Sequence, residues 1–254
     1  MLAEERRARL LNELRDHGYI QVSELAESLH ISSATIRRDL TVLEKEGLCI
    51  RKRGGAVRNS QGTTLELPYE VKKHHFVEEK KRIAHEALKL VENGDTLILD
   101  AGSTTYALAQ LLFSKQRLTV VTNDLQIAIK LATNPNVYLV CTGGIARANV
   151  YTLQGNQVES FVNTLRVDKT FLGADAIHED GTIANVNIEE VAIKRAMIKA
   201  ASQVILLADS SKFDIRGFAK VCDLEDISLI ITDTNIPEKA KALLKERGTQ
   251  FIAT

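Results

Sequence analysis

Short apolar runs alternate with helical stretches along most of this 254-residue chain, and this alternation constrains the fold more than any other feature. The apolar runs are TLIL, LTVV, VYLVC, KTFLG, VILLA, SLIIT and QFIA. The helical stretches include TTYALAQLLF, LQIAIKLAT, EVAIKRAMIKAAS and EKAKALLKERG. Strands that alternate with helices form a mainly parallel sheet that the helices cover. The pattern therefore predicts an α/β domain over 76–254, which opens with a charged amphipathic helix.

Residues 1–58 predict a different and smaller domain with three short helices. The first helix ends near His17-Gly18, and its apolar side is formed by Leu10, Leu11 and Leu14. Ser23 is a suitable N-cap for the second helix, and Ser32 for the third. The turn between these two helices begins at His30, and Ile31 fills it. The inner face of the third helix is Ile36, Leu40 and Leu43, at helical spacing.

The outer face of the third helix carries short hydroxyls and cations, which are the side chains that contact base edges and phosphates. Its candidate DNA-binding residues are Ser33, Thr35, Arg37, Arg38 and Thr41. A hairpin that turns at Gly54-Gly55 follows and places Arg51, Lys52 and Arg53 on a short β-wing. These three cations alone indicate no more than a solvated charge run. Directly after a helix pair, however, they predict a winged helix-turn-helix domain that binds double-stranded DNA.

The charge distribution supports this prediction, although 33 Lys and Arg balance 33 Asp and Glu over the whole chain. Between Ser33 and Arg58, seven cations face only Asp39, Glu44 and Glu46. The amino terminus does not resemble a signal peptide, and no apolar run is long enough to span a bilayer. Cys49, Cys141 and Cys222 lack metal or redox spacing and are expected to be buried in a reducing compartment. We expect a cytoplasmic protein with no membrane partner, bound metal or cofactor.

Polar residues follow three successive strands of the larger domain. Ligands of such sheets bind at the carboxyl ends of the strands. The first end leads from Asp100 into a helix through Gly102, Ser103, Thr104 and Thr105, a turn that suits a phosphate but also an ordinary capped helix. The next two ends carry Asn123-Asp124 and Gly143-Gly144. Three such ends together predict a polar pocket that accepts phosphate.

Two later segments offer further candidates for this pocket. Asp175 follows a strand, and Glu190 and Lys194 are four residues apart on one predicted helix face. A surface ion pair is the alternative interpretation of these two. Lys212 follows another strand and can reach an anion, unless it is merely solvated. The six histidines show no metal-ligand spacing.

Both halves of the chain resemble the DeoR family of bacterial transcription regulators. ISSATIRRDLTVLEKEGLCIRKRGGAV matches the family's DNA-reading segment, and DAGSTT, VTND, TGG, FLGAD, EVAIKRAMI and LLADSSKF match its effector domain. The resemblance implies a fold similar to ribose-5-phosphate isomerases and a phosphorylated sugar as effector. It places the phosphate at 102–105, lines the pocket with Asn123, Asp124, Gly143 and Gly144, and directs Asp175, Glu190, Lys194 and Lys212 to the sugar or anion. The chain departs from the family at Ala176 and His178, where the family pattern has Gly and Asp, and at Val191, where sugar identity would be read.

These features predict a repressor of a carbohydrate-utilisation operon whose operator affinity depends on a phosphorylated sugar. The expected domains are 1–58 for DNA binding, a polar linker over 59–75, and 76–254 for sensing the effector. One small DNA-binding module makes few contacts, so we expect a homo-oligomer, either a dimer or a tetramer. The main alternative is a sugar-phosphate isomerase with an accessory DNA-binding domain, in which Asp175 or Glu190 acts as the base. A third possibility is a larger domain that serves only for assembly.

Overall fold

The computed structural model describes residues 2–58, 66 and 68–254, and the chain divides into two compact units, Met1–His75 and Phe76–Thr254. The side chains of Arg15, Asp16, Arg58 and Asp214 lie outside the description. Part of the predicted linker over 59–75 is helical, because Tyr69–His74 forms helix α4 of the first unit. The positions 59–65 and 67 of that linker lie outside the described residues.

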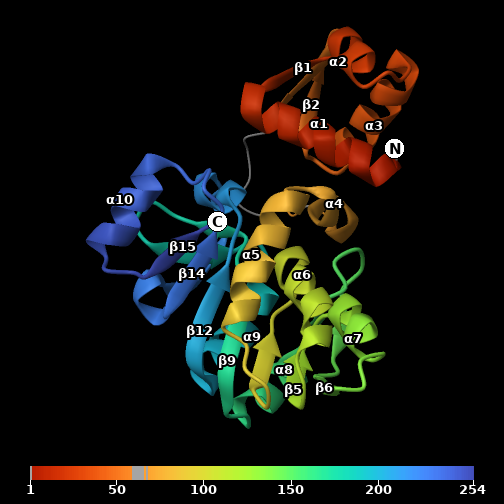
Figure 1. The fold of residues 1–254 in the computed structure, drawn as a ribbon. Coiled ribbons are helices and arrows are strands. Elements are labelled where there is room, and N and C mark those ends of the chain that lie inside the picture. The colour runs from red at the N-terminus through yellow and green to blue at the C-terminus, as the bar shows by residue number, and fades with distance from the viewer. Residues whose placement is uncertain (1, 59–65, 67) are drawn as a thin grey trace. The chain divides into compact units, whose positions relative to one another are not determined.

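The first unit is a winged helix (Figure 1). Its remaining elements are α1 (Ala3–His17), β1 (Tyr19–Gln21), α2 (Val22–Ser28), α3 (Ser33–Lys45), β2 (Cys49–Lys52) and β3 (Gly55–Arg58). The strands form an antiparallel sheet in the order β1-β3-β2. The predicted apolar faces meet in one core, where Leu10, Ile36, Leu40 and Leu43 have no exposed surface. The predicted winged helix-turn-helix fold is confirmed.

The predicted N-cap of the second helix is wrong by two residues. Helix α2 begins at Val22 with Gln21 as its N-cap, and Ser23 lies inside the helix. The reason is tertiary: β1 pairs with β3 as far as Gln21, and the amide of Val22 donates to the carbonyl of Gly54 at 2.9 Å. The chain therefore passes from strand to helix without a capping loop. Ser32 caps α3 as predicted, because its side chain accepts from the amide of Thr35 at 3.1 Å.

The two glycines of the wing have different structural roles, which the sequence did not distinguish. The turn is formed by Arg53 and Gly54, and only Gly54 adopts a positive φ, of 83°. Gly55 already belongs to β3. A Cβ at Gly55 would lie 1.8 Å from the carbonyl oxygen of Ile20, so glycine is required there for the close approach of β1 and β3.

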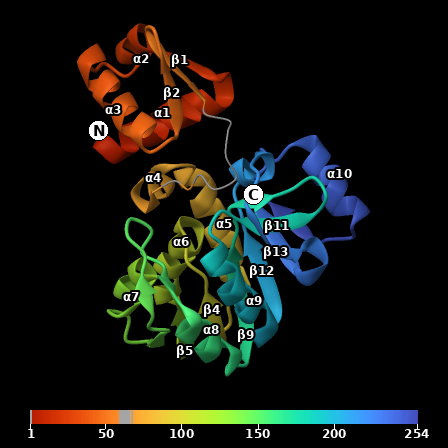
Figure 2. The same ribbon diagram turned by 180° about the vertical axis from the view of Figure 1, so that it is seen from behind.

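The second unit is a seven-stranded sheet between helices, seen from two sides in Figures 1 and 2. The strand order is β15-β14-β12-β9-β4-β5-β6, and every ladder is parallel. The strands are β4 (Thr96–Leu99), β5 (Leu118–Thr122), β6 (Val137–Cys141), β9 (Val167–Gly173), β12 (Ala201–Leu207), β14 (Leu229–Thr232) and β15 (Phe251–Ala253). All seven overlap predicted runs, although β9 and β12 begin before theirs, and β12 includes Ala201 and Ser202, which the sequence pattern gave to a helix. The predicted α/β domain with a parallel sheet is thus confirmed.

Helices cover both faces of this sheet because its strands are apolar on both sides. One face packs against α5 (Val77–Lys89), α6 (Ser103–Leu111) and α7 (Leu125–Leu131). The other packs against α8 (Asn156–Asn163), α9 (Val191–Ala200) and α10 (Glu238–Glu246). The sequence did not predict α8, which is short and buries only Val158 and Val162.

Small antiparallel pieces, also missing from the sequence prediction, are added beyond the strand ends. They are the pair β7 (Ile145–Ala146) and β8 (Leu153–Gln154), and the sheet of β10 (Ala176–Ile177), β11 (Thr182–Asn185) and β13 (Ala219–Asp223). Short 3-10 turns complete the unit: η1 (Leu112–Ser114), η2 (Ile188–Glu190), η3 (Ser210–Asp214) and η4 (Leu224–Asp226). Among the described residues, no helix has the length and apolar character that crossing a membrane requires.

The expectation that all three cysteines are buried is wrong for Cys141. Cys49 and Cys222 are buried, and burial raises the pKa of their thiols to about 11 and about 12. Cys141 is exposed because β6 is an edge strand of the sheet.

Candidate functional site

The outer face of α3 presents the predicted cations to solvent. Arg37 and Arg38 are exposed, and Ser33, Arg37 and Thr41 share one side of the helix at a spacing of four. Ser33, Thr35 and Thr41 are half-buried. Thr35 is engaged at the helix start, where its hydroxyl lies 2.8 Å from that of Ser32. Lys52 and Arg53 are exposed on the wing.

The wing is attached to the predicted recognition helix by Arg51. Nη1 of Arg51 donates to Oγ1 of Thr41 at 2.8 Å and to the carbonyl of Arg37 at 3.3 Å. The amide of Arg51 also donates to the carboxylate of Glu44 at 3.1 Å. Arg51 and Thr41, both predicted DNA contacts, therefore pair with each other in this structure. Their pairing fixes the wing beside α3, so the cations of both elements belong to one surface.

Asp39 does not oppose the cations of this surface. It lies on the buried side of α3, 4% exposed, between Arg6 and Arg7 of α1. The Arg6 guanidinium binds both carboxylate oxygens, and the hydrogen bond to Asp39 is the main cause that raises the pKa of Arg6. The acid counted against DNA binding in the sequence thus joins α1 to α3 and leaves the outer face more basic than the sequence indicates.

In the second unit, the end of β4 is joined to the end of β9 through Asp100. Its Oδ2 accepts from the amide of Gly173 at 2.8 Å and from Nζ of Lys194. Lys194 also donates to the Gly173 carbonyl at 3.0 Å. Burial by itself lowers the pKa of Lys194, but the carboxylates of Asp100, Glu190 and Asp175 outweigh it and raise that pKa. Lys194 is therefore a charged, buried partner of Asp100, with 4% of its surface exposed.

Asp124 connects the end of β5 to the predicted phosphate turn. Its Oδ1 caps α7 by accepting from the amides of Gln126 and Ile127, at 2.7 and 3.0 Å. Its Oδ2 accepts from the amide of Gly102 at 3.1 Å. Gly102 has a φ of 155° and is the N-cap of α6, whose first turn supplies the amides of Ser103, Thr104 and Thr105. The first amides of a helix have no partner inside it and attract anions.

The protonation of Asp124 predicts a pH dependence of stability. Burial raises the pKa of Asp124 to about 6, although three backbone amides act to lower it. A carboxyl whose pKa is higher in the folded chain stabilises the fold at low pH, and this contribution is lost as the pH rises through about 6. Relative to the Asp124→Asn variant, the unchanged protein should gain about 1 kcal/mol of unfolding free energy between pH 7 and pH 5.

Urea unfolding of both proteins at the two pH values measures this difference, since the other titrating groups are common to both. Asparagine also caps helices well, so the variant keeps the start of α7. An equal stability difference at both pH values contradicts the assignment.

Glu190 is buried and has two partners that the sequence did not indicate. It lies in η2 at the start of α9, where Oε1 pairs with Nη1 of Arg147 at 3.1 Å and Oε2 accepts from Nδ2 of Asn185 at 2.8 Å. The alternative interpretation, a surface pair of Glu190 and Lys194, is not found, because both residues are buried and Lys194 pairs with Asp100 instead. Asp175 stays in the same region and accepts from the amide of Val186 at 3.1 Å.

Sequence reasoning missed Arg147 and Asn185. Arg147 follows β7 and reaches Glu190 over the strand ends, and Asn185 ends β11. No motif marks either residue, since both are brought to the strand ends by the small antiparallel pieces. Buried amide oxygens remain without a hydrogen-bond partner at Asn123 and Asn185 within the described part of the chain. Such groups are costly unless a ligand or water satisfies them.

The contacts of the described residues do not join the remaining predicted effector residues, Gly143, Gly144 and Lys212, to this group. Gly143 is exposed with a φ of 70°, and a Cβ at Gly144 would meet Val158 at 2.5 Å, so Gly144 serves the packing of α8. Lys212 is in η3 beside Asp209, which pairs with the buried Lys80 at 3.0 Å. No contact among the described residues joins Lys212 to Asp100 or Asp124.

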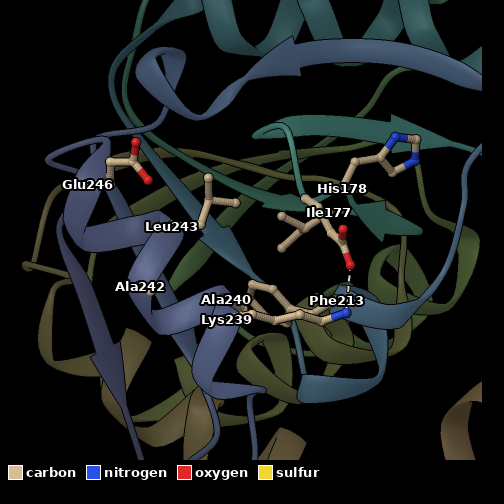
Figure 3. A pocket seen from close by; sticks show the side chains of 9 residues that line it. Ile177, His178, Phe213, Lys239, Ala240, Ala242, Leu243 and Glu246 are labelled. Atoms are coloured by element: carbon tan, nitrogen blue, oxygen red, sulfur yellow. Dashed lines mark hydrogen bonds and ion pairs between the residues drawn. The ribbon is translucent and has the colours of Figure 1, made fainter.

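A separate cavity of about 300 Å³ opens between β10 and α10 (Figure 3). Its apolar wall includes Ile177, Phe213 and Leu243, and none of the predicted effector residues lines it. His178 belongs to its rim and accepts from the amide of Gly217 at 3.0 Å. His178, where the chain departs from the family pattern, thus supports the loop before β13.

Comparison with known families identifies both units. Residues 6–62 match the DeoR-like helix-turn-helix domain, and residues 75–234 match the DeoR C terminal sensor domain. The chain belongs to the DeoR family. With a DeoR-like helix-turn-helix domain and a DeoR sensor domain, it is a DNA-binding transcriptional regulator rather than an enzyme.

Curated relatives extend over nearly the whole chain. It is 33% identical to the putative aga operon transcriptional repressor of Escherichia coli O157:H7, over 98% of this chain and 93% of that protein. It is also 33% identical to the glycerol-3-phosphate regulon repressor of Haemophilus influenzae, over 97% and 95%. Among solved structures, ribose 5-phosphate isomerase A of Methanocaldococcus jannaschii matches 54% of this chain and 55% of its own, with a TM-score of 0.41 and 19% identity.

Proposed function

We propose that this DeoR-family protein represses a carbohydrate-utilisation operon and that a phosphorylated sugar controls its affinity for the operator. The observation that carries the effector part is the group of polar residues at the ends of β4, β5 and β9, next to the first turn of α6. Relatives named as repressors of the aga operon and the glycerol-3-phosphate regulon support the regulatory part. Operator DNA is cytoplasmic in bacteria, so the protein is assigned to that compartment.

The DNA contacts in this proposal divide by their position on the winged helix. Arg37 and Arg38 on α3 are exposed beside the hydroxyls of Ser33 and Thr35, so this side enters the major groove. Lys52 and Arg53 at the wing contact the backbone or the minor groove. Arg51 and Thr41 hold the two elements in register. Operators with two half-sites require at least a dimer.

The effector contacts divide into a phosphate end and a sugar end. The phosphate binds the amides of Ser103, Thr104 and Thr105 and the positive end of α6. The sugar hydroxyls bind Asn123 and Asn185, whose buried amide oxygens accept no hydrogen bond in the described part of the chain. Arg147 and Glu190 close this end from the β7 side. Asp100 and Lys194 position the strand ends, since each already satisfies the other.

A charge introduced at the phosphate end tests the effector site. In the Ser103→Asp variant, the new carboxylate stabilises the start of α6 but repels a phosphate. We expect at least a tenfold loss of apparent affinity for the active sugar phosphate, with thermal stability preserved. Gln110→Glu, the same change of charge near the far end of α6, is the matched control.

The measurement has two stages. A thermal-shift screen of phosphorylated sugars, with the unphosphorylated sugars beside them, finds the effector, and a fluorescence-anisotropy titration of an operator fragment shows its effect on DNA binding. If no sugar phosphate stabilises the protein, the effector proposal is wrong and the second unit serves only for assembly. Equal responses of the Ser103→Asp variant and the control would place the phosphate elsewhere.

A further inference from the structure

Strand β6 is an unprotected edge of the seven-stranded sheet. It has β5 on one side only, in a regular parallel ladder from Val137 to Cys141. Its sequence, V-Y-L-V-C, contains no charged residue and no proline. Edge strands usually carry charges, proline or a bulge that prevents pairing with another chain. The ladder of β6 contains none of these features.

The backbone direction of β6 follows from its two ends. The carbonyl of Asn136 accepts from the amide of Leu118 at 3.0 Å, and the amide of Thr142 donates to the carbonyl of Thr122 at 3.1 Å. Since alternate residues of a strand face the same neighbour, the even-numbered residues face β5. The backbone groups of Val137, Leu139 and Cys141 therefore point away from the sheet. The amide of Val137 is used by Asn134, but its carbonyl and both groups of Leu139 face no strand of the sheet.

We propose that β6 pairs with β6 of a second copy of this chain, antiparallel about a two-fold axis at Leu139. Leu139 exchanges both backbone hydrogen bonds with its symmetry mate. The amide of Cys141 donates to the carbonyl of the partner's Val137. By symmetry, the amide of the partner's Cys141 donates to the carbonyl of Val137. One sheet then continues through both subunits.

The side chains of β6 are self-complementary in this register. Tyr138, whose surface is 74% exposed in the single chain, comes to lie opposite the partner's Val140. An aromatic side chain opposite a β-branched one in a non-hydrogen-bonded pair is a favourable cross-strand contact. Cys141 comes to lie opposite the partner's Val137, so no pair across the axis brings charges together. Because the same five residues serve both sides, a second copy fits this edge better than an unrelated strand.

This inference adds to the proposed function the surface through which two DNA-binding units are brought to one operator. Its test uses the full chain without DNA or sugar phosphate, so its failure and the failure of the proposed function are separate results. Sedimentation equilibrium compares the unchanged protein with Tyr138→Lys, and the control is Phe218→Lys, where the aromatic ring is 56% exposed elsewhere. We expect Tyr138→Lys to halve the mass of the assembly and the control to leave it unchanged. A monomeric unchanged protein, or an unchanged mass of the Tyr138→Lys variant, overturns the proposal.

A cross-link tests the register itself. Residues opposite each other in a hydrogen-bonded antiparallel pair have Cα atoms about 5.5 Å apart, which a short bifunctional thiol reagent spans. Val137→Cys should therefore be cross-linked by such a reagent to the partner's Cys141. The Val137→Cys, Cys141→Ser double variant and the unchanged protein should not, because positions 137 and 141 lie opposite each other and not opposite their own symmetry mates, and Cys49 and Cys222 are buried. A folded Val137→Cys variant without cross-link, or cross-linking of the unchanged protein through Cys141, overturns the antiparallel register.

Discussion

Replacing Arg38 by Glu should lower the affinity for the operator by about a hundredfold, the largest effect expected of any single exposed residue. Arg38 is exposed on the outer face of α3, and Asp39 beside it is turned inward to Arg6. The reversal removes one phosphate or base contact and adds repulsion from the DNA backbone. The expected fall corresponds to two factors of ten at about 1.4 kcal/mol each.

The measurement uses an operator selected from random DNA by the unchanged protein, titrated by fluorescence anisotropy at several salt concentrations. The slope of log K against log salt should also become shallower by about 1, because one fewer counterion is released. Lys245→Glu, an equal change of net charge on the exposed side of α10 in the sensor unit, is the control and should bind as the unchanged protein does. Full operator affinity with an unchanged salt slope would remove Arg38 from the interface.

Replacing Lys194 by Met should destabilise the sensor unit by about 3–5 kcal/mol, because it leaves Asp100 as an uncompensated buried charge. The side chain of Asp100 is only 1% exposed. For a unit of this size the loss lowers the melting temperature by about 10 °C. The position also joins β4 to β9, so the response to the effector should weaken at temperatures where the variant is still folded.

Calorimetry of two further variants distinguishes the effect of leaving Asp100 as an unpaired buried charge from the effect of removing any lysine. Adding Asp100→Asn to Lys194→Met removes the orphaned charge and should restore part of the lost stability. Lys239→Met breaks an ion pair with Glu179 whose side chains are 60% and 76% exposed. It should change stability by less than about 1 kcal/mol. If Lys194→Met costs no more than Lys239→Met, Asp100 is neutral or hydrated in the folded chain.

Most of the secondary structure, the outer face of α3 and the polar residues at the strand ends could be predicted from local patterns. Ile36, Leu40 and Leu43 are spaced for one helix face, and that spacing alone decides that Arg37 and Arg38 point outward. The seven apolar runs are strands because each is short and bounded by polar turns. Residues such as Gly102 and Asp124 follow such runs directly, so their place at the strand ends follows from the sequence.

Partners between strands could not be predicted, because they depend on strand order. Strand β9 lies between β4 and β12, far from its place in the chain order, and this brings Gly173 and Lys194 to Asp100. In the sequence, Glu190 was the nearest partner for Lys194. Arg147 lies 43 positions before Glu190 and reaches it only through the hairpin of β7 and β8. Long-range pairs of this kind have no local pattern.

The sequence by itself determined that this chain has a winged helix with an exposed basic helix, followed by a parallel α/β domain with polar strand ends. Hydrophobic periodicity and turn residues depend on only a few neighbouring positions, so they can be recognised in the sequence without knowledge of the fold. The tertiary structure alone decided which charged side chains pair with other residues of the protein and which remain exposed to a partner. Asp39, Lys194 and Arg51 are occupied by distant residues, whereas Arg37, Arg38 and the edge of β6 face outward. Burial and strand order set these differences, and both exist only after the chain has folded.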